Sequence, residues 1–228
     1  MTPFVFLPGT LCDERLWHNQ TALFKEHHHV NLRTQDNLPD MIAEVEKAPF
    51  KKFIVVGFSM GGYVALEFAL NFPDRVKHVV AIGSSFLGYP AHELQVVEKA
   101  IPMIEKGLFK GITQRRMKEF LHPDSYEKAE VRDLIQSMAG PDASAVYLRQ
   151  LKATLYRNNL SDKIIHLKKP LTAIGGKQDQ VVLPETILEF KKAVPNSNVI
   201  LLEGCGHFVP LEKPNEVNEI LRNLAESF

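Results

Sequence analysis

A serine with a glycine two residues before it and another two residues after it marks a candidate nucleophile. Ser59 is the centre of residues 57–61, Gly-Phe-Ser-Met-Gly, which follow the apolar run at 53–56 and lead into a helix-like segment. In a sharp turn from a strand into a helix, such glycines keep side chains off the crossing and the strained serine presents its hydroxyl. The pattern occurs by chance in roughly one in ten to fifteen chains of this length. Its position between a strand and a helix is therefore what makes Ser59 a candidate.

A hydroxyl is a weak nucleophile near neutral pH, so Ser59 needs a base and a group that orients the base. Asp179 directly follows an apolar run at 171–175, and His207 directly follows another at 199–203. Both residues are thus expected on loops at the carboxyl ends of strands, at the same sheet edge as Ser59. The order Ser, Asp, His accompanies a nucleophile elbow. We predict that the three are catalytic, although each has a commoner role by itself: a helix N-cap for the serine, a turn residue for the aspartate and a loop residue for the histidine.

Acyl chemistry also needs backbone N–H donors that face the developing oxyanion. One predicted donor is Met60, which follows the nucleophile at the start of the expected helix. The other belongs to the loop after the first apolar run, where Thr10 is the first choice and Leu11 the alternative. By itself Pro8-Gly9 indicates only an ordinary turn, so this assignment depends on the larger pattern.

The elements that would hold these residues alternate between strands and helices. This alternation indicates an α/β fold with a mostly parallel sheet, and continuous apolar runs are typical of strands covered on both faces. After Ser84 the alternation gives way to segments with helical spacing until about residue 165. We predict a core domain of residues 1–84 and 166–228, and an all-helical cap of residues 85–165 inserted after the strand that ends near Gly83. The expected strands are 4–7, 29–33, 53–57, 78–83, 171–175 and 199–203.

Composition narrows the class of protein. The chain has 228 residues, of which 45% are hydrophobic, so it can bury the core of one domain. Lys and Arg number 27 and Asp and Glu number 27, which leaves no net field to attract nucleic acid or an anionic membrane. The first residues include no basic region, and their apolar run is too short for a signal peptide or a membrane span. We expect a soluble cytoplasmic protein that acts on a small molecule, without nucleic-acid or membrane partners, as a monomer or a homodimer.

Cysteine and histidine usage does not point to a metal site. Cys12 and Cys205 are too few for a disulfide framework or a zinc site, and we expect reduced thiols with packing roles. The run of three histidines at 27–29 precedes an expected strand, and we interpret it as a strand edge or turn more readily than as a metal tract. No metal or other cofactor is expected.

Several further motifs combine with the serine motif along the chain. They are Leu-Pro-Gly-Thr at 7–10 with Trp17 downstream, Phe-Pro-Asp-Arg-Val at 72–76, the segment 170–179, and Gly-Cys-Gly-His at 204–207 followed by Glu-Lys-Pro at 212–214. From residue 4 to near its end, the chain resembles the α/β-hydrolase superfamily, specifically the capped branch of esterases, acyl-transfer hydrolases and carbon–carbon bond hydrolases. The combination is specific for the fold and poorly specific for the substrate.

Two departures from the family pattern matter. The family usually has His-Gly where this chain has Pro8-Gly9, so a side chain that often braces the oxyanion loop is absent. Family members also usually carry an antiparallel hairpin before the strand equivalent to residues 4–7. We therefore expect a reduced sheet of about six strands.

The resemblance and the residues together predict a serine hydrolase that cleaves a small ester, thioester or activated acyl compound through an acyl-enzyme. One alternative is a carbon–carbon bond hydrolase or elimination enzyme that uses the same triad, and another is a non-catalytic small-molecule binding protein on the same fold. In this branch the cap supplies most of the pocket, so either the pocket lining or the cap's own core is expected to contain Met103, Ile104, Leu108, Phe109, Met117, Phe120 and Leu121. Candidates for carboxylate recognition, although helix-surface arginines are common, are Arg115, Arg116, Arg149 and Arg157.

Overall fold

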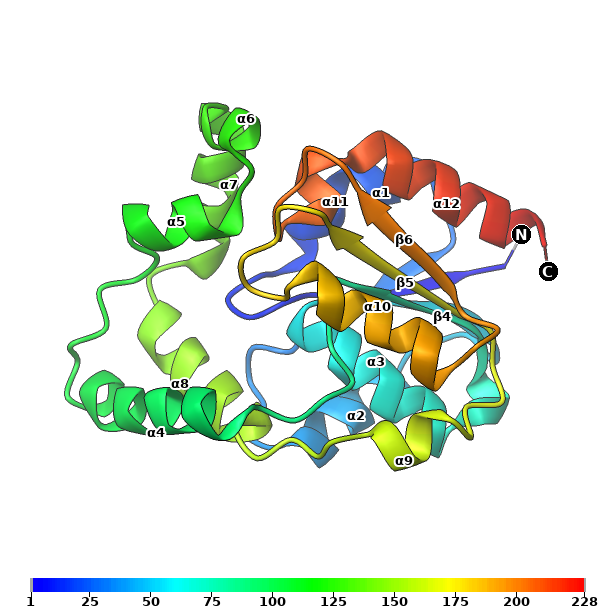
Figure 1. Cartoon of the computed structure of the whole chain (residues 1–228), viewed down its shortest axis with the longest axis horizontal. Coiled ribbons are helices and arrows are strands. Elements are labelled where there is room, and N and C mark those ends of the chain that lie inside the picture. The colour runs from blue at the N-terminus through cyan, green and yellow to red at the C-terminus, as the bar shows by residue number, and fades with distance from the viewer. Residues whose placement is uncertain (1, 228) are drawn as a thin grey trace.

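A single sheet of six parallel strands organises the molecule (Figure 1). The computed structural model describes residues 2–227, without the side chains of residues 92 and 93. The strand order is β2-β1-β3-β4-β5-β6, which puts β3 and β4 in the middle of the sheet. The predicted α/β fold, with a parallel sheet of about six strands flanked by helices, is confirmed. The strands are β1 (Phe4–Leu7), β2 (His27–His29), β3 (Phe53–Phe58), β4 (Val76–Ile82), β5 (Leu171–Gly176) and β6 (Asn198–Leu202).

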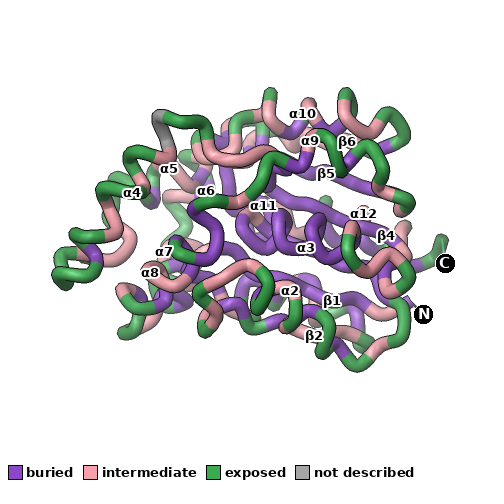
Figure 2. Tube along the Cα trace, turned by 90° about the horizontal axis from the view of Figure 1, so that it is seen from below, coloured by how far each residue is buried: buried purple, intermediate pink, exposed green. Residues whose placement is uncertain are grey.

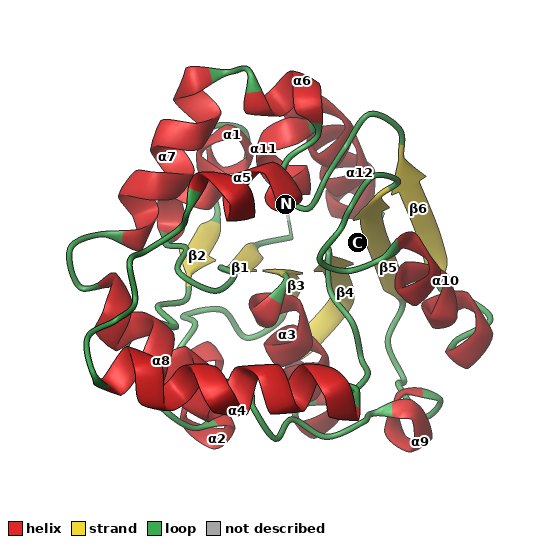
Figure 3. Ribbon diagram, turned by 60° about the vertical axis from the view of Figure 1, so that its left-hand side comes forward, coloured by secondary structure: helices red, strands yellow, loops and turns green. Residues whose placement is uncertain are grey.

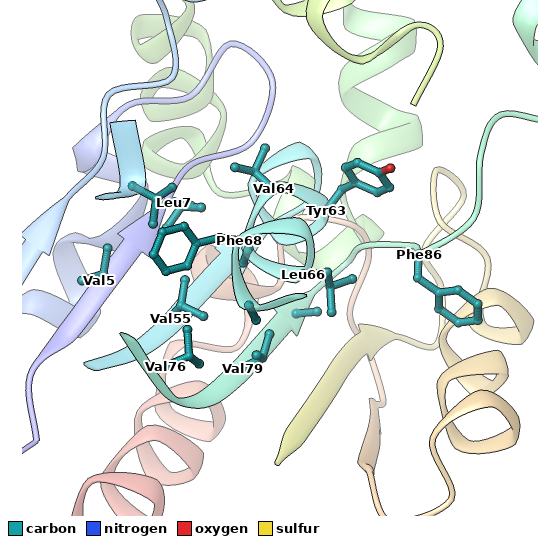
Figure 4. Close-up of a cluster of buried hydrophobic side chains, with 14 of the residues drawn as sticks. Val5, Leu7, Val55, Tyr63, Val64, Leu66, Phe68, Val76, Val79 and Phe86 are labelled. Carbon is teal, nitrogen blue, oxygen red and sulfur yellow. The ribbon is translucent and has the colours of Figure 1, made fainter. Parts of the chain in front are cut away.

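Alternate side chains of each strand point to opposite faces of the sheet and pack into two clusters. Val5 and Val55 belong to the first cluster, which α2, α3, α9 and α10 cover (Figure 4). Phe4 and Phe6 belong to the second, which η1, α11 and α12 cover. Burial on both faces explains why the central strands are apolar along their whole length. The helices of this layer are η1 (Glu14–Trp17), α1 (His18–Thr21), α2 (Leu38–Glu46), α3 (Met60–Asn71), η2 (Pro73–Arg75), α9 (Ser161–Ile164), α10 (Pro184–Ala193), α11 (Val209–Glu212) and α12 (Pro214–Glu226).

Between β4 and β5 the described chain forms helices and loops only. Figure 1 places α4 to α8 beyond the carboxyl ends of the strands, and Figure 3 shows α4 and α5 in front of those ends. Burial is concentrated in the strands and α3, whereas α4 is largely exposed or half-buried (Figure 2). We use the term helical segment for α4 (Ala91–Glu105), α5 (Gln114–Phe120), α6 (Pro123–Tyr126), α7 (Ala129–Ala139) and α8 (Ala143–Thr154).

The chain rejoins the core layer before β5 begins. Leu160 and Ile164, just before and within α9, are fully buried in the cluster that α3 covers. Leu160 N–H donates to the backbone oxygen of Phe86 (2.9 Å), so the two ends of the helical segment run close together. The cap boundaries at residues 85 and 165 stay a prediction, and α9 packs with the core.

The second strand lies earlier in the chain than the sequence predicts. β2 consists of His27–His29, whereas residues 29–33 were the expected strand. β1 ends at Leu7 before Pro8, and the Phe6–His29 pair is already its last register partner with β2. Beyond that point the Asn31 side chain accepts the Arg33 N–H (3.0 Å), a local bond that competes with strand pairing. The histidine run therefore forms the edge strand itself.

The histidines of β2 pack on an aromatic neighbour. The His29 and His27 rings lie 5.9 and 6.4 Å from the Phe6 ring, between centroids. Among the described residues, no group of three or more His, Cys, Asp or Glu side chains is arranged to hold a metal ion. Within the same range of the chain, no helix is long and apolar enough to cross a membrane.

Candidate active site

Ser59 occupies the sharp turn between β3 and α3. Its backbone has φ 51° and ψ −116°, a strained conformation for a residue with a side chain. Its N–H donates to the Ile82 oxygen of β4 (2.8 Å), which ties the turn to the neighbouring strand. A Cβ added at Gly57 would lie 2.2 Å from the Gly61 oxygen, and one at Gly61 would lie 2.5 Å from the Leu7 oxygen. Only glycine at these two positions lets the strand, the helix and the loop after β1 approach so closely.

The three side chains predicted to be catalytic lie together at the carboxyl edge of the sheet. His207 Nε2 is 3.1 Å from Ser59 Oγ, and His207 Nδ1 is 2.8 Å from Asp179 Oδ2. Asp179 and His207 are 2% and 3% exposed, while Ser59 is half-buried and thus reachable. An unbroken chain of contacts therefore runs from a buried carboxylate through an imidazole to a partly accessible hydroxyl.

The chemistry of the carboxylate assigns the protons in this chain. An ionised Asp179 accepts only, so His207 Nδ1–H donates to Asp179 Oδ2 and leaves Nε2 as the acceptor in neutral imidazole. The other carboxylate oxygen, Oδ1, accepts the N–H groups of Val181 (2.7 Å) and Val182 (2.9 Å). The carboxylate is thus fixed by its own loop and holds the imidazole in the tautomer whose Nε2 can accept a hydrogen bond from the Ser59 hydroxyl.

His207 is also held by the helical segment. Its N–H donates to the Phe120 oxygen at the end of α5 (2.7 Å), and its ring lies 6.1 Å from the Phe120 ring and 5.0 Å from the Phe58 ring. A Cβ added at Gly206 would lie 2.7 Å from both the His122 nitrogen and the Phe120 oxygen. Glycine at 206 therefore allows the backbone after α5 to lie directly on the histidine loop. Phe120, predicted as a pocket residue, lies beside the site.

Glu212 is a buried carboxylate that links the same two segments. Its Oε2 accepts the N–H of His122 (2.8 Å) and the N–H of Gly206 (3.1 Å). Burial raises the pKa of Glu212, although these backbone N–H bonds act in the opposite direction. Sequence reasoning assigned no role to this residue, and the Glu-Lys-Pro motif after the histidine was the only signal for it.

The loop after β1 forms a turn against Ser59. We use the name oxyanion loop for residues 9–12, because they include Thr10, the predicted oxyanion donor. Cys12 N–H donates to the Gly9 oxygen (3.1 Å) and closes the turn, while a Cβ at Gly9 would lie 3.3 Å from Ser59 Cβ. Among the described residues, the N–H groups of Thr10 and Met60 have no hydrogen-bond acceptor, whereas Leu11 N–H donates to Gln150 Oε1 (2.9 Å).

A cavity of about 420 Å³ lies between α5 and the loop that follows β5. Its lining includes Gln180, the residue after Asp179, but none of Ser59, Asp179 and His207. Arg115 and Arg116, two of the predicted carboxylate-binding arginines, pair with Glu119 at 3.2 and 2.7 Å. The cavity is lined by Gln114, Arg115, Lys118, Glu119 and Gln180.

The other two predicted arginines contact the protein itself. Arg149 Nε donates to the Arg33 backbone oxygen (3.0 Å), and the Arg157 guanidinium lies 4.2 Å from the centre of the Tyr89 ring. Both arginines are half-buried. Arg149 thus links α8 to the loop after β2, and Arg157, just after α8, packs on the loop before α4.

The remaining predicted pocket residues between β4 and β5 differ in how far they are buried. Met103 and Leu108 are 51% and 52% exposed and face solvent. Ile104, Met117 and Leu121 are buried, the last two in the cluster on the η1 side of the sheet. Phe109 is partly buried next to the side chain of Leu11 and its neighbours.

Both cysteines are buried. Burial raises the pKa of the Cys12 thiol to about 12 and also raises the pKa of the Cys205 thiol. A thiol that stays protonated is a poor nucleophile. This favours the packing roles expected for both residues and leaves Ser59 as the candidate nucleophile.

Comparison with known proteins identifies relatives of the chain. A family model described as the alpha/beta hydrolase fold matches residues 8–214. The monoacylglycerol lipase ABHD6 of Bos taurus is 31% identical over 188 residues, which cover 75% of this chain and 54% of the lipase. A 2-hydroxy-6-oxononadienedioate/2-hydroxy-6-oxononatrienedioate hydrolase of Paraburkholderia phymatum is 26% identical over 174 residues, 73% of this chain and 60% of that enzyme. The matches thus span little more than half the length of these curated relatives.

A solved structure shares the fold over the whole chain. A thermophilic esterase from Thermogutta terrifontis superposes with a TM-score of 0.84, covering 100% of this chain and 90% of the esterase, at 18% sequence identity. At this identity the likeness concerns the arrangement of the elements.

Proposed function

Because the chain belongs to the α/β-hydrolase family, we propose that it is a serine hydrolase that cleaves a small ester, thioester or activated acyl substrate through an acyl-enzyme. The observation that carries the proposal is the contact chain Asp179 Oδ2, His207 Nδ1, His207 Nε2, Ser59 Oγ, with distances of 2.8 and 3.1 Å. Bond lengths in this range are those expected between a nucleophile, its base and the group that orients the base.

In the proposed reaction Ser59 Oγ attacks the acyl carbon while His207 Nε2 takes the hydroxyl proton. His207 then gives this proton to the leaving group, and Asp179 stabilises the imidazolium that forms in between. Water next attacks the acyl-enzyme with His207 as base, which releases the acid and restores Ser59.

The developing oxyanion needs fixed donors close to Ser59. We propose the N–H groups of Met60 and Thr10. Met60 lies at the N-terminus of α3, where the helix dipole favours negative charge. Leu11 N–H already donates to Gln150 Oε1, which supports Thr10 over Leu11 as the second donor.

A fluorophosphonate probe and a series of p-nitrophenyl esters of increasing acyl length test this proposal. We expect the probe to label the wild type at Ser59, and ester hydrolysis to be lost in Ser59→Ala. The acyl series then bounds the size of the pocket. Unlabelled folded protein, together with unchanged ester hydrolysis in Ser59→Ala, would contradict the proposal. Tight ligand binding without turnover would favour a binding protein instead.

A second candidate function is hydrolysis at a carbon–carbon bond by the same three residues. The similarity to the Paraburkholderia hydrolase supports it. In this case p-nitrophenyl esters would be poor substrates and little acyl-enzyme would accumulate. Turnover of a vinylogous diketone under the same conditions would favour this candidate over the esterase.

A further inference from the structure

We propose that Gln150 of α8 is a positioning residue, which holds the oxyanion loop in its catalytic conformation. It would take the place of the bracing side chain that Pro8 lacks. This inference rests on the proposed function, because the loop affects the rate only if Ser59 attacks an acyl group.

The Gln150 amide is fixed at both of its polar ends. Its Oε1 accepts the N–H of Leu11 (2.9 Å), and its Nε2 donates to the oxygen of Leu32 (2.9 Å). The residue is 1% exposed, so water does not compete freely for these groups. An amide turned the other way would place its NH₂ against an N–H and its oxygen against a carbonyl. The surroundings therefore specify an acceptor facing the oxyanion loop.

Leu11 has a strained backbone, and its buried N–H needs an acceptor. Its φ of 59° lies in the left-handed region that glycine favours and leucine rarely adopts. The turn closed by Cys12 N–H and the Gly9 oxygen has this residue in its third position, where type II turns require positive φ. Without Gln150 the peptide between Thr10 and Leu11 would bury an unpaired N–H, and a change of turn type would relieve both the strain and the unpaired donor. Such a change alters ψ of Thr10 and reorients its carbonyl, next to the N–H that we propose as the donor.

The side chain of Leu11 packs against α7 and α8. It is 6% exposed and packs in a small cluster with Ala139 of α7 and with Ala143 and Val146 of α8. Two independent contacts, one apolar and one hydrogen bond, thus join the apex of the oxyanion loop to the helical segment.

Arg33 ties α7 and the start of α8 to the core loop that contains Leu32, the second hydrogen-bond partner of Gln150. Its guanidinium donates to the Met138 oxygen (2.9 Å), the Ala139 oxygen (3.0 Å) and Asp142 Oδ1 (2.9 Å). It directly follows Leu32, whose oxygen accepts from Gln150. The glutamine therefore spans two core loops from a fixed helix, and a small shift of that helix would move the oxyanion donor. A loss of alignment of this kind lowers kcat more than it raises KM, because the oxyanion forms in the transition state.

The test compares two variants that remove the amide, Gln150→Met and Gln150→Leu, with Gln150→Glu, which as the neutral acid keeps an acceptor for Leu11 N–H and an O–H donor for the Leu32 oxygen. Thr154→Val is the matched control, because Thr154 Oγ1 donates to the Gln150 backbone oxygen (2.8 Å) one turn further along α8. With a p-nitrophenyl ester we expect both removal variants to lose about 10- to 100-fold in kcat with KM within about threefold. The kcat of Gln150→Glu should lie between that of the removal variants and that of the wild type. The kcat of Thr154→Val should stay within about threefold of the wild-type value.

Amide hydrogen exchange at Leu11 gives a readout that does not depend on activity. We expect exchange at least about tenfold faster in the removal variants than in the wild type, Gln150→Glu and Thr154→Val, in samples with native circular dichroism. Unchanged exchange, or a wild-type kcat in a folded removal variant, would overturn the role of Gln150. A wild type without Ser59-dependent turnover would instead overturn the proposed function, and Leu11 exchange would still decide whether Gln150 holds the loop.

Discussion

Asp179 and His207 lie in the loops after strands β5 and β6, and Ser59 directly follows β3, whereas the apex of the oxyanion loop is hydrogen-bonded to a residue 139 positions further along the chain. The three side chains therefore take their places from the register of the sheet. The apex of the loop is hydrogen-bonded to α8, which lies outside the core layers. Under the proposed function, nucleophile activation relies on the sheet and stabilisation of the oxyanion relies on the helical segment.

His207 lies where these two kinds of support meet. Its side chain contacts Asp179 and Ser59, while its backbone N–H donates to Phe120 at the end of α5. Glu212 strengthens this junction by accepting N–H groups from both sides of it. Substitutions on each side of the comparison should therefore have separable effects.

The largest effect is expected on the sheet side. Asp179→Asn should lower kcat by about 10⁴-fold, because an amide can stabilise the wrong imidazole tautomer and cannot stabilise the imidazolium. Steady-state kinetics with a p-nitrophenyl ester measures it. Asp74→Asn, at an exposed aspartate, is the matched control and should leave kcat unchanged. A loss of less than about tenfold in Asp179→Asn would contradict the assignment of the orienting group.

The junction should respond mainly in stability. Glu212→Ala leaves the N–H groups of His122 and Gly206 without their acceptor, at a cost of about 2–4 kcal/mol in the free energy of unfolding. Glu212→Gln keeps an acceptor oxygen and should cost about 1 kcal/mol or less at neutral pH. Urea unfolding of the three proteins measures both values. Equal destabilisation by the two substitutions would show that the hydrogen bonds from the helical segment are not what Glu212 contributes.

The pH dependence of stability sharpens the same comparison. Burial raises the pKa of Glu212 above its ordinary value of 4.5, so the folded state keeps this proton to higher pH than the unfolded chain. The stability contributed by the protonated form is complete below the unfolded pKa and is lost as pH rises through the folded pKa. Glu212→Gln cannot ionise. The difference in the free energy of unfolding, Glu212→Gln minus wild type, should therefore increase as the pH rises from the unfolded-state pKa of Glu212 to its folded-state pKa, and be constant above that. A difference that does not change with pH would contradict the raised pKa.

The smallest effect is expected at the two thiols, one in each compared region. Cys12 lies in the oxyanion loop and Cys205 in the loop that carries His207, and burial raises the pKa of each thiol. Iodoacetamide near pH 8 should therefore leave both unmodified in the native wild type and alkylate both in urea, as mass spectrometry can report. In Gln150→Met, Cys12 should react before Cys205. Equal rates for the two thiols would indicate that the oxyanion loop does not open separately from the histidine loop.

The sequence predicted the parts that carry a local signal. Ser59, Asp179 and His207 each adjoin an apolar run next to glycine, and strand register then brings their side chains together. β2 was placed too late because the predicted strand was taken from Val30 and Leu32, which are buried after the pairing with β1 has ended.

Residues that act through long-range contacts had no such signal. Gln150 looks like an ordinary polar residue of a helix, and only the folded chain shows that its amide lies between Leu11 and Leu32. Glu212 was visible as part of a motif, but its partner His122 lies 90 residues away. Neither contact can be read from composition or periodicity, because both depend on how the helical segment sits on the sheet.

Rapid-quench mass spectrometry with p-nitrophenyl acetate tests the central claim most directly, that Ser59 is the nucleophile of an acyl-enzyme. The account predicts a burst of p-nitrophenol together with one acetyl group on the peptide that contains Ser59. The adduct should be absent in Ser59→Ala and should decay at the rate of steady-state turnover. Turnover without any acetylated Ser59 peptide, or an acetyl group on a different residue, would contradict it.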